Sequence, residues 1–516
     1  MSQPLQSINL VAPAFKGINT EDSPIAQDPS FAEIADNAVI DKRGRIAARK
    51  GHVVLTTNKT ELGSESIRSI AEYKDSSGNK KIFSVGNNKI LSGTSTLVDE
   101  TPASYTITAD NWKMVNFNDN LYFFQSSYEP LVYNNTDGIS KMSAVTGASL
   151  VADIPKANEV IGAYGRLWCA NTGTDKSTVY WSDLLIGQNW TGGTSGSIDV
   201  SKVWPDGYDE IVSLAAHNGF LIIFGKHSIV VYQGAEAPAT MSLADTVAGV
   251  GCVDRDTVQH TGTDVIFLSH TGLRSFGRTI QQKSMPISTL SKTITKDITE
   301  LLQNENSFYR SVYSPEENFY LLTFVGQQTT YCFDLRGQLE DGSFRVTQWP
   351  GSVFTCYERL ENGDLYIGTS LGISSYSGYA DNGSSYRFRY YSPSLTFGDI
   401  SKLKILKKIK PTLVGANSST VFMKFAYDFG TTYRTTEFTV GNQTPAYFNI
   451  NEFHGDDPGD ESDPLSEFTG GELTTQRSLN AVGSGATVVI GLEADISGFA
   501  LSLQEINVQA LIGKTV

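Results

Sequence analysis

Cysteine, basic residues and long apolar runs are all scarce in this chain of 516 residues. Its four cysteines, Cys169, Cys252, Cys332 and Cys356, lie far apart and form no CxxC pair. This spacing excludes a zinc ribbon and a thioredoxin-type redox pair, so we expect free, buried thiols. No stretch of about 18 residues is continuously apolar, and the amino terminus lacks the charged start and apolar core of a secretory signal. We therefore expect no membrane insertion, and synthesis in a cytoplasm.

The small number of basic residues affects whether the protein surface can bind nucleic acid. Lysine and arginine total 40 against 55 aspartates and glutamates, a formal net charge of −15. A surface that binds nucleic acid by neutralising phosphates needs clustered lysine and arginine, so this charge argues against one. An acidic wall repels phosphates, however, and a duplex can slide past it without sticking.

Familiar catalytic motifs are missing as well. The sequence contains no GxxxxGK[ST] loop, no HExxH and no GxSxG. The segment 181–190 resembles a sialidase box, but its Asp-to-Gly spacing is four residues instead of two and it occurs once. The six histidines are dispersed, although a ring of repeats could bring His217, His260 and His270 to equivalent turn tips. We expect no catalytic, cofactor or metal site, and a protein that is not an enzyme.

What the sequence does contain is a repeat of turns and apolar strands. Seven segments share a polar turn, an apolar strand, a second turn and a strand ending in an aromatic residue, and they start at Ser69, Val115, Ile161, Val212, Val258, Ser311 and Cys356. The starts are 46, 46, 51, 46, 53 and 45 residues apart. Four-stranded propeller blades occupy about 40–50 residues. The spacing predicts an all-β fold with a β-propeller of six or seven blades over residues 61–384.

Details of the turns support this prediction. Asn218–Gly219 and Asn362–Gly363 suit the positive φ angles of two-residue hairpin turns, and apolar runs suited to buried strands follow both. The glycines of AGVGCVD at 248–254 indicate a tight backbone approach within a blade. One blade could combine strands from both ends of the repeat region. Ordinary hairpins of a sandwich or of two barrels remain the alternative.

One segment departs from the strand pattern. Within 288–308, Ile294, Ile298, Leu301 and Leu302 recur at helical spacing after a candidate cap at Ser291. We expect a helix over about 289–307 that packs against the propeller, with a partner-binding helix as the alternative.

Residues 1–60 predict an extended arm, because their prolines interrupt any sustained period. The arm ends in a hairpin turned at Gly44, and five of the nine residues 42–50 are basic. Its Lys42, Arg43, Arg45 and Arg49 are candidate assembly contacts with an acidic neighbour; a merely solvated hairpin face is the other interpretation.

From residue 385 to 516, six or seven alternating segments predict a separate β-sandwich. Five lysines crowd into 402–410, and the stretch 452–472 carries eight acidic residues and no basic one. Opposite charges on two subunits could pair through these segments. The candidate assembly contacts are Lys402, Lys404, Lys407, Lys408, Asp456, Asp457, Asp460 and Glu461. The acidic loop, 454–467, could alternatively bind calcium or simply be solvated, and it lacks the D-x-D-x-D-G order of a calcium loop.

Together these segments resemble a known family. Residues 165–190, 213–234 and 249–278, with the amino-terminal KGINTEDSP and ADNAVIDKRGRIAARKG, are similar to the tail-nozzle proteins of short-tailed bacteriophages, also called tail hub or DNA-stabilisation proteins. The similarity covers about residues 13 to 440 and rests on strand and turn patterns. The acidic loop and the tail beyond it are its least typical parts.

The resemblance implies a virion protein of the phage tail without catalytic residues. In that family a propeller with an added β-platform forms a homohexameric ring below the portal and adaptor rings, and the ring continues the channel that retains and conducts double-stranded DNA. The implied partners are further copies of the chain, the adaptor ring, and tail fibres, spikes or a plug.

A second function class stays open. A propeller can also bind or depolymerise a cell-surface polysaccharide, and Trp168, Trp181 and Trp190 could stack on sugars. Burial of these tryptophans inside blades is the competing interpretation.

Overall fold

The computed structural model describes residues 5–12, 14–103, 105, 107, 111–282, 289–304, 308–416, 418–441 and 474–515. The chain forms two compact units. The platform unit comprises residues 1–52, 345–350 and 377–516, and the propeller unit comprises 53–344 and 351–376. The candidate acidic contacts Asp456, Asp457, Asp460 and Glu461, and with them the calcium alternative, lie outside the described residues.

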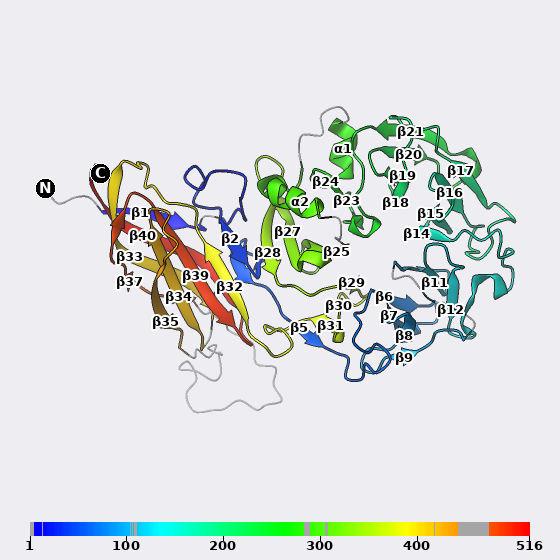
Figure 1. Cartoon of the computed structure of the whole chain (residues 1–516), viewed down its shortest axis with the longest axis horizontal. Helices are drawn as coiled ribbons and strands as arrows, with labels where there is room; N and C mark the ends of the chain where they lie inside the picture. Colours follow the sequence, from blue (N-terminus) through cyan, green and yellow to red (C-terminus); the bar gives the residue numbers. More distant parts are fainter. Residues whose placement is uncertain are drawn as a thin grey trace, which may run out of the picture. The chain divides into compact units, whose positions relative to one another are not determined.

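The propeller unit is a ring of antiparallel sheets, as predicted, and Figure 1 shows them arranged around a common centre. Six are separate sheets and the hairpins β25–β27 complete the ring. The first sheet contains β6 (Ser69–Lys74), β7 (Lys80–Gly86), β8 (Lys89–Ser92) and β9 (Val98–Asp99), and the second contains β10 (Lys113–Phe117), β11 (Asn120–Phe124), β12 (Leu131–Asn134) and β13 (Gly138–Lys141). The third sheet contains β14 (Ala157–Ala163), β15 (Arg166–Thr172), β16 (Thr178–Trp181) and β17 (Gly196–Asp199). The fourth contains β18 (Ile211–His217), β19 (Phe220–Gly225), β20 (Ile229–Gln233) and β21 (Ser242–Val247).

The remaining strands of the ring are β22 (Gln259–His260), β23 (Val265–Ser269), β24 (Gly272–Ser275); β25 (Tyr309–Ser314), β26 (Phe319–Phe324), β27 (Thr329–Gln338); and β29 (Cys356–Arg359), β30 (Leu365–Thr369), β31 (Gly372–Tyr376) with β5 (His52–Val54). Strand β5 precedes the repeats in sequence yet pairs with β31, and the N–H of Leu55 donates to the Ile373 carbonyl at 2.8 Å. The first strands of neighbouring sheets contact one another from β6 through β10 and β14 to β18, and from β22 through β25 to β29, which contacts β6. Strand β18 contacts the 3₁₀ turn Arg255–Thr257 that precedes β22. A blade built from both ends of the repeat region therefore closes the ring.

Apolar side chains between neighbouring sheets hold the blades together. The middle strands are almost wholly buried, as in FLIIFG of β19. Between β18–β21 and β22–β24, Phe224 packs against Phe267 with ring centroids 4.9 Å apart and ring planes inclined by 50°. Each blade thus covers the apolar face of the next, which a single blade cannot do alone.

The turns largely follow the prediction. Asn218 and Gly219 both have positive φ, at 50° and 80°, which is the conformation that Asn-Gly supplies in a tight hairpin. At the second Asn-Gly pair only Gly363 has positive φ, at 90°. Asn362 instead accepts a hydrogen bond from the Asp364 N–H at 3.0 Å, so this part of the prediction was wrong. A Cβ on Gly251 would lie 2.2 Å from the Lys226 backbone, which confirms the close approach predicted there.

Helices are short. The propeller unit contains α1 (Phe276–Gln282), α2 (Thr295–Leu302) and the 3₁₀ turns η1 (Met142–Ala144), η2 (Pro238–Thr240), η3 (Arg255–Thr257), η4 (Lys292–Ile294) and η5 (Val325–Gln327). The predicted helix is present as η4 and α2, and its buried apolar residues are Ile294 and Ile298. Helix α1 was not predicted. No helix among the described residues is both long and apolar enough to span a membrane.

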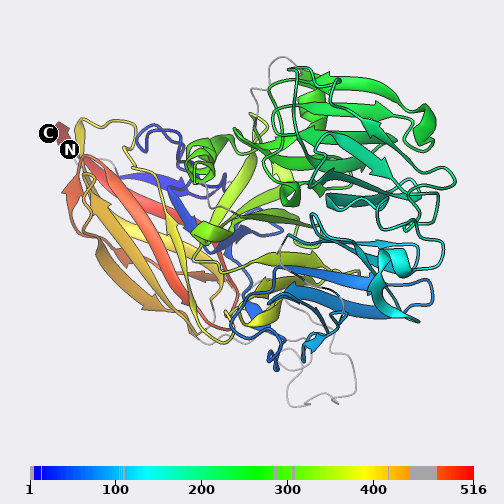
Figure 2. The same ribbon diagram turned by 45° about the vertical axis from the view of Figure 1, so that its right-hand side comes forward.

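The platform unit consists of two sheets. The first contains β1 (Leu5–Leu10), β3 (Ala38–Ile40), β4 (Ile46–Ala48), β33 (Lys402–Gly415), β36 (Thr474–Gln476), β37 (Leu479–Asn480), β38 (Ser484–Gly485) and β40 (Leu501–Thr515). The second contains β2 (Ile34–Asp36), β28 (Phe344–Pro350), β32 (Tyr386–Tyr391), β34 (Thr420–Tyr427), β35 (Arg434–Thr439) and β39 (Val488–Ile496). Figure 2 shows the first strands of the chain lying among the last ones in this unit.

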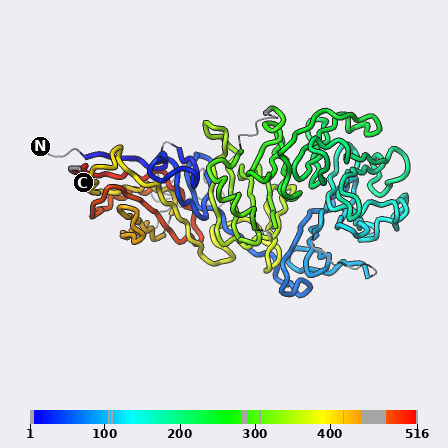
Figure 3. Tube along the Cα trace, turned by 45° about the horizontal axis from the view of Figure 1, so that its top comes forward, coloured from blue at the N-terminus to red at the C-terminus, as the bar shows by residue number. Residues whose placement is uncertain are grey.

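The amino-terminal segment differs from the predicted arm. Strand β1 pairs with β40 in antiparallel register from Leu5↔Leu511 to Leu10↔Ile506, and the tube in Figure 3 shows the two running side by side. Strands β2, β3 and β4 are likewise members of the two sheets. The prolines do divide the early chain into short strands, but these strands pair with strands far along the sequence. Local sequence patterns cannot reveal such long-range pairing.

Candidate functional site

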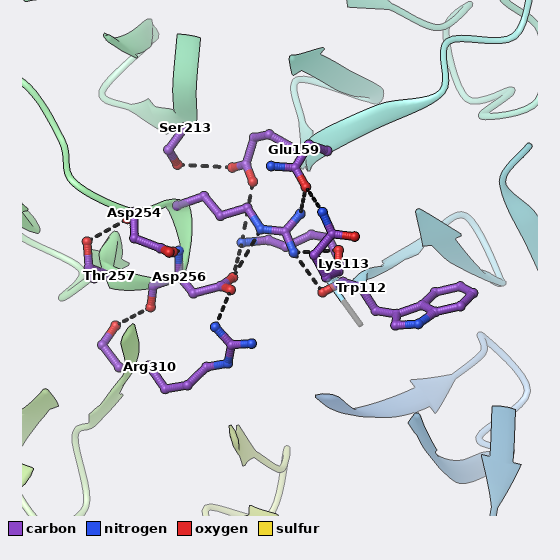
Figure 4. A network of polar contacts seen from close by, with 12 residues as sticks. Trp112, Lys113, Glu159, Ser213, Asp254, Asp256, Thr257 and Arg310 are labelled. Carbon is purple, nitrogen blue, oxygen red and sulfur yellow. Dashed lines mark hydrogen bonds and ion pairs between the residues drawn. The ribbon is translucent and has the colours of Figure 1, made fainter. Parts of the chain in front are cut away.

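A cluster of charged side chains lies at the axis of the propeller unit, where the first strands of the blades lie. Asp256, in η3, is the centre of this cluster. Its carboxylate lies 2.9 Å from Arg310, 3.5 Å from Arg255 and 3.8 Å from Lys113. Figure 4 shows Lys113, Asp256 and Arg310 pointing toward one another from β10, η3 and β25. Three cations from three blades therefore share one anion.

Glu159 on β14 forms a second centre. Its side chain is 1% exposed, and Oε1 accepts hydrogen bonds from Ser213 Oγ at 3.0 Å and from the Leu214 N–H at 3.3 Å. The second oxygen, Oε2, accepts no hydrogen bond and lies 3.7 Å from Lys113 Nζ. Lys113 thus links the buried carboxylate of Glu159 to the partly exposed carboxylate of Asp256.

Arg255 ties blades together across the axis. Its guanidinium donates to the carbonyl of Asn111 at 2.7 Å, to the carbonyl of Trp112 at 3.0 Å and to Asn158 Oδ1 at 3.2 Å. The planar fork of an arginine suits such divergent acceptors. This one side chain joins the segments that precede β10 and β22 to β14.

Burial and neighbouring charges shift the pKa values of these acids. Burial, together with the Asp256 carboxylate, raises the pKa of Asp254 to about 6. Burial alone would raise the pKa of Asp256 too, but Arg255, Arg310 and Lys113 hold that pKa below its usual value. Burial raises the pKa of Glu159 against the opposing charge of Lys113. The axis is therefore a set of paired groups in which Asp256 is the most firmly ionised acid.

Glu358 on β29 lies farther along the axis. Burial raises the pKa of its carboxyl to about 8, and the nearby charge of Glu72 adds to the effect. Its side chain is partly exposed and borders a cavity of about 150 Å³. Glu358 Oε1 accepts a hydrogen bond from the Glu72 N–H at 3.4 Å.

A larger cavity of about 500 Å³ lies beside the Asp256 cluster. Its walls include Arg68, Asn111, Asn158, Asn171, Val212, Lys226, Asp254, Arg255, Phe308 and Arg310. Both cavities are bordered by Arg68, Asp256 and Arg310. The described residues include no group of three or more His, Cys, Asp or Glu side chains placed to hold a metal ion. What the arrangement offers chemically is charge pairing and hydrogen bonding.

The predicted basic contacts are divided between surface and interior. Lys42 and Arg43 are exposed on the hairpin of β3 and β4, which turns at Gly44 as expected. Arg45 is buried and lies 2.7 Å from Asp41. Arg49 is 4% exposed, pairs with Asp381 at 2.6 Å and covers the Tyr386 ring at 4.2 Å. Arg45 and Arg49 therefore stabilise the platform unit itself.

The lysines of β33 divide in the same way. Lys402, Lys407 and Lys408 are exposed, and Lys402 lies 3.1 Å from Asp399. Lys404 is fully buried and donates to the carbonyls of Asp399 and Ala486, the latter at 2.7 Å. The prediction that Lys404 is a surface contact was wrong. The pairing of β33 with β40 shifts register between Lys402 and Lys404 and again between Leu406 and Lys408, so Lys404 faces inward while Lys402 and Lys408 are exposed.

Aromatic, cysteine and histidine predictions can be placed as well. Trp168, Trp181 and Trp190 are between 0% and 6% exposed, so they are blade residues and offer no sugar platform. All four cysteines are buried and free, as predicted. The histidines form two pairs across the seam between β18–β21 and β22–β24, with ring centroids 6.3 Å apart for His217 and His260, and 5.5 Å for His227 and His270.

Sequence reasoning missed the axial residues. Lys113, Glu159, Asp256, Arg310 and Glu358 each lie within two residues of the start of a repeat. That common position was the available signal, since the first strand of each blade lines the axis. Which of the charges pair with one another depends on the closed ring and could not be inferred.

Comparisons with known proteins show only distant likenesses. No family model and no curated protein matches the chain. Among solved structures, the extracellular domain of the B. thetaiotaomicron one-component system BT4673 matches with a TM-score of 0.43 and 12% identity, over 64% of this chain and 40% of that one. The chain thus spans less than two thirds of that structure.

Two propellers match with similar values. The WD40 β-propeller domain of Doa1 has a TM-score of 0.35 and 13% identity, over 63% of this chain and 96% of that domain. The C-terminal WD40 domain of Sif2 has a TM-score of 0.38 and 12% identity, over 73% and 98%. Likenesses at this level carry no argument about function.

Proposed function

We propose that this chain is a structural subunit of the tail nozzle of a short-tailed bacteriophage, located in the virion tail and without catalytic activity. Six copies form a ring that extends the channel of the portal and adaptor rings, retains packaged DNA and conducts it during ejection. The proposal rests on the sequence resemblance. The presence of both a propeller and a β-platform agrees with what that resemblance implies.

The observation that bears most on mechanism is the closed axis of the propeller. The Asp256 cluster crosses it, and the cavities beside that cluster measure about 500 and 150 Å³. A duplex whose major groove alone is about 12 Å wide cannot pass there. The DNA path in this proposal therefore lies between subunits, where a net acidic chain attracts few phosphates.

The assembled ring is the first test. Purified protein, or virions, imaged by electron microscopy should show a six-fold ring on the tail axis. A particle that stays monomeric at high concentration and shows no ring within virions would refute the proposal.

The exposed lysines of β33 supply the second test. Lys407→Glu with Lys408→Glu should weaken assembly, because both side chains are exposed and could meet an acidic neighbour, whereas the exposed Lys402 already pairs with Asp399. Lys404 is excluded from the variant because its burial makes any change there a folding defect. Lys292→Glu with Lys296→Glu, at two exposed lysines of the propeller unit, is the matched control. Analytical ultracentrifugation should report smaller assemblies for the β33 variant alone.

The alternative of a glycan-binding propeller has no comparable support. All six tryptophans of the chain are buried, including the three that were candidates for sugar stacking. A glycan array and a depolymerase assay would decide it directly.

A further inference from the structure

The larger axial cavity differs from the rest of the chain in its charge. Acidic residues outnumber basic ones by 55 to 40 overall, whereas the cavity walls carry Arg68, Lys226, Arg255 and Arg310 against Asp254 and Asp256. Its volume, about 500 Å³, falls within the range of ligand sites. A cavity whose walls carry more cationic than anionic side chains suits an anion.

The guanidinium of Arg310 has N–H donors that are not used by the described residues. Its Nη1 donates to Asp256 at 2.9 Å and to the Tyr309 carbonyl at 2.8 Å. Among the described residues, its Nε and Nη2 take part in no hydrogen bond or ion pair. In Figure 4 the guanidinium reaches Asp256 with one nitrogen and directs another away from it. The unused edge can hold an oxyanion while the pair with Asp256 stays intact.

The two acids of the wall do not cancel this attraction. Asp256 is already shared by Arg255, Arg310 and Lys113. Asp254 accepts the Asp256 N–H at 2.8 Å and so serves as the cap of η3. The Asp256 carboxylate and Oδ1 of Asp254 are thereby engaged by protein donors.

Asn111 supplies the complementary group. Its Nδ2 donates to Asn158 Oδ1 at 2.6 Å, whereas its own Oδ1 is buried and accepts no hydrogen bond. A buried acceptor without a donor is costly, by about 1–3 kcal/mol in general. A ligand that fits this wall therefore brings a hydroxyl as well as a negative charge.

We propose that this cavity binds a small oxyanion that carries a hydroxyl group, with hydrogen phosphate as the simplest example. The charged oxygens accept from the free edge of Arg310, and the P–OH donates to Asn111 Oδ1. The phosphate can come as the free ion or as a small phosphate monoester. Because a monoester is mostly dianionic near pH 7, a hydroxyl of its organic group then takes the place of the P–OH. This inference does not depend on the proposed role in a phage tail.

Ligand binding to the full-length protein tests the proposal. Isothermal titration and thermal unfolding would compare inorganic phosphate, ribose 5-phosphate, sulfate and chloride at equal ionic strength near pH 7. Phosphate should bind saturably and raise the melting temperature, since a ligand that binds only the folded state stabilises it. Sulfate, which has no proton to donate to Asn111, should bind more weakly. If ribose 5-phosphate binds more tightly than inorganic phosphate, the natural ligand is a phosphate monoester. If inorganic phosphate binds more tightly, the natural ligand is the free ion.

Two variants locate the site. Arg310→Lys keeps the charge beside Asp256 but loses the free fork, and should weaken phosphate binding by about tenfold or more. Asn111→Ala, which leaves the Asp256 pairs intact, should abolish the preference for phosphate over sulfate. Arg359→Lys, at an arginine that pairs with Glu316 at 2.5 Å outside the cavity, should change neither. Equal, non-saturating effects of phosphate and sulfate, or unaltered binding by both cavity variants, would overturn the proposal.

Discussion

Individual charged side chains at the propeller axis act on several blades at once. Arg255 bonds to the backbone before β10 and to Asn158 on β14, while Asp256 next to it pairs with Arg310 on β25. A buried charge is tolerated when opposite charges and hydrogen bonds surround it. The axial residues therefore help to fix the arrangement of the ring as well as to line its cavities.

Glu358 gives a test at the residue scale. Because its folded pKa is about 8, against an ordinary value of 4.5, the folded state holds a proton that the unfolded state releases. Its contribution to stability is therefore lost as the pH rises from about 4.5 to about 8. Glu358→Gln should remove this loss, so that the variant gains stability relative to the wild type as the pH rises. Urea titrations at pH 5 and pH 8 measure the difference.

The control lies on the same hairpin. Glu361 is exposed, and Lys80 and Lys74 lower the pKa of its carboxyl. Glu361→Gln should therefore lack the gain at pH 8. Parallel pH profiles for wild type and Glu358→Gln would contradict the assignment.

At the scale of elements, the seam between β18–β21 and β22–β24 is distinctive, because four of the six histidines form pairs across it. His227 and His270 lie in turns, and their rings stack with 24° between planes. Burial lowers the pKa of His260 and of His270, and the paired imidazole lowers each further. Asp209 opposes this at His270 without reversing it.

The seam predicts a sensitivity to acid. Since the folded pKa of His260 and of His270 lies below the ordinary 6.5, the unfolded state binds more protons, and stability falls as the pH drops below about 6.5. His227→Gln should reduce the loss of melting temperature between pH 7 and pH 5. Hydrogen exchange should show faster opening of β22–β24 at pH 5 in the wild type. A variant as acid-sensitive as the wild type would argue that other groups cause the effect.

At the scale of the whole molecule, the two ends of the chain build one unit. Six residue pairs join β1 to β40, and β4 also pairs with β40. The propeller is an insertion between these ends, and its own closure uses β5 from one side and β29–β31 from the other. Both units therefore bring sequence-distant strands together.

Removing residues 1–12 should expose this dependence. The deletion takes away β1, so the edge of β40 loses its partner over Leu5–Leu10. We expect hydrogen exchange to accelerate at residues 506–511 and to stay unchanged in β14 and β15. Stability should decrease by a few kcal/mol, on the order of several lost hydrogen bonds. Unaltered protection of β40 would show that β1 contributes little.

Seven hairpin units at nearly constant spacing are enough to predict the propeller, because such units bury their apolar faces only by stacking in a ring. The sequence by itself likewise determined the turn at Gly44, the close approach at Gly251 and the burial of the cysteines, which depend on local chemistry. Three features follow only from the tertiary structure. The first residues of the chain complete the platform unit, Lys404 and Arg49 face inward, and the Asp256 carboxylate forms ion pairs with three cationic side chains. Those outcomes depend on strand register and on ring closure between residues hundreds of positions apart, where no local pattern carries the information.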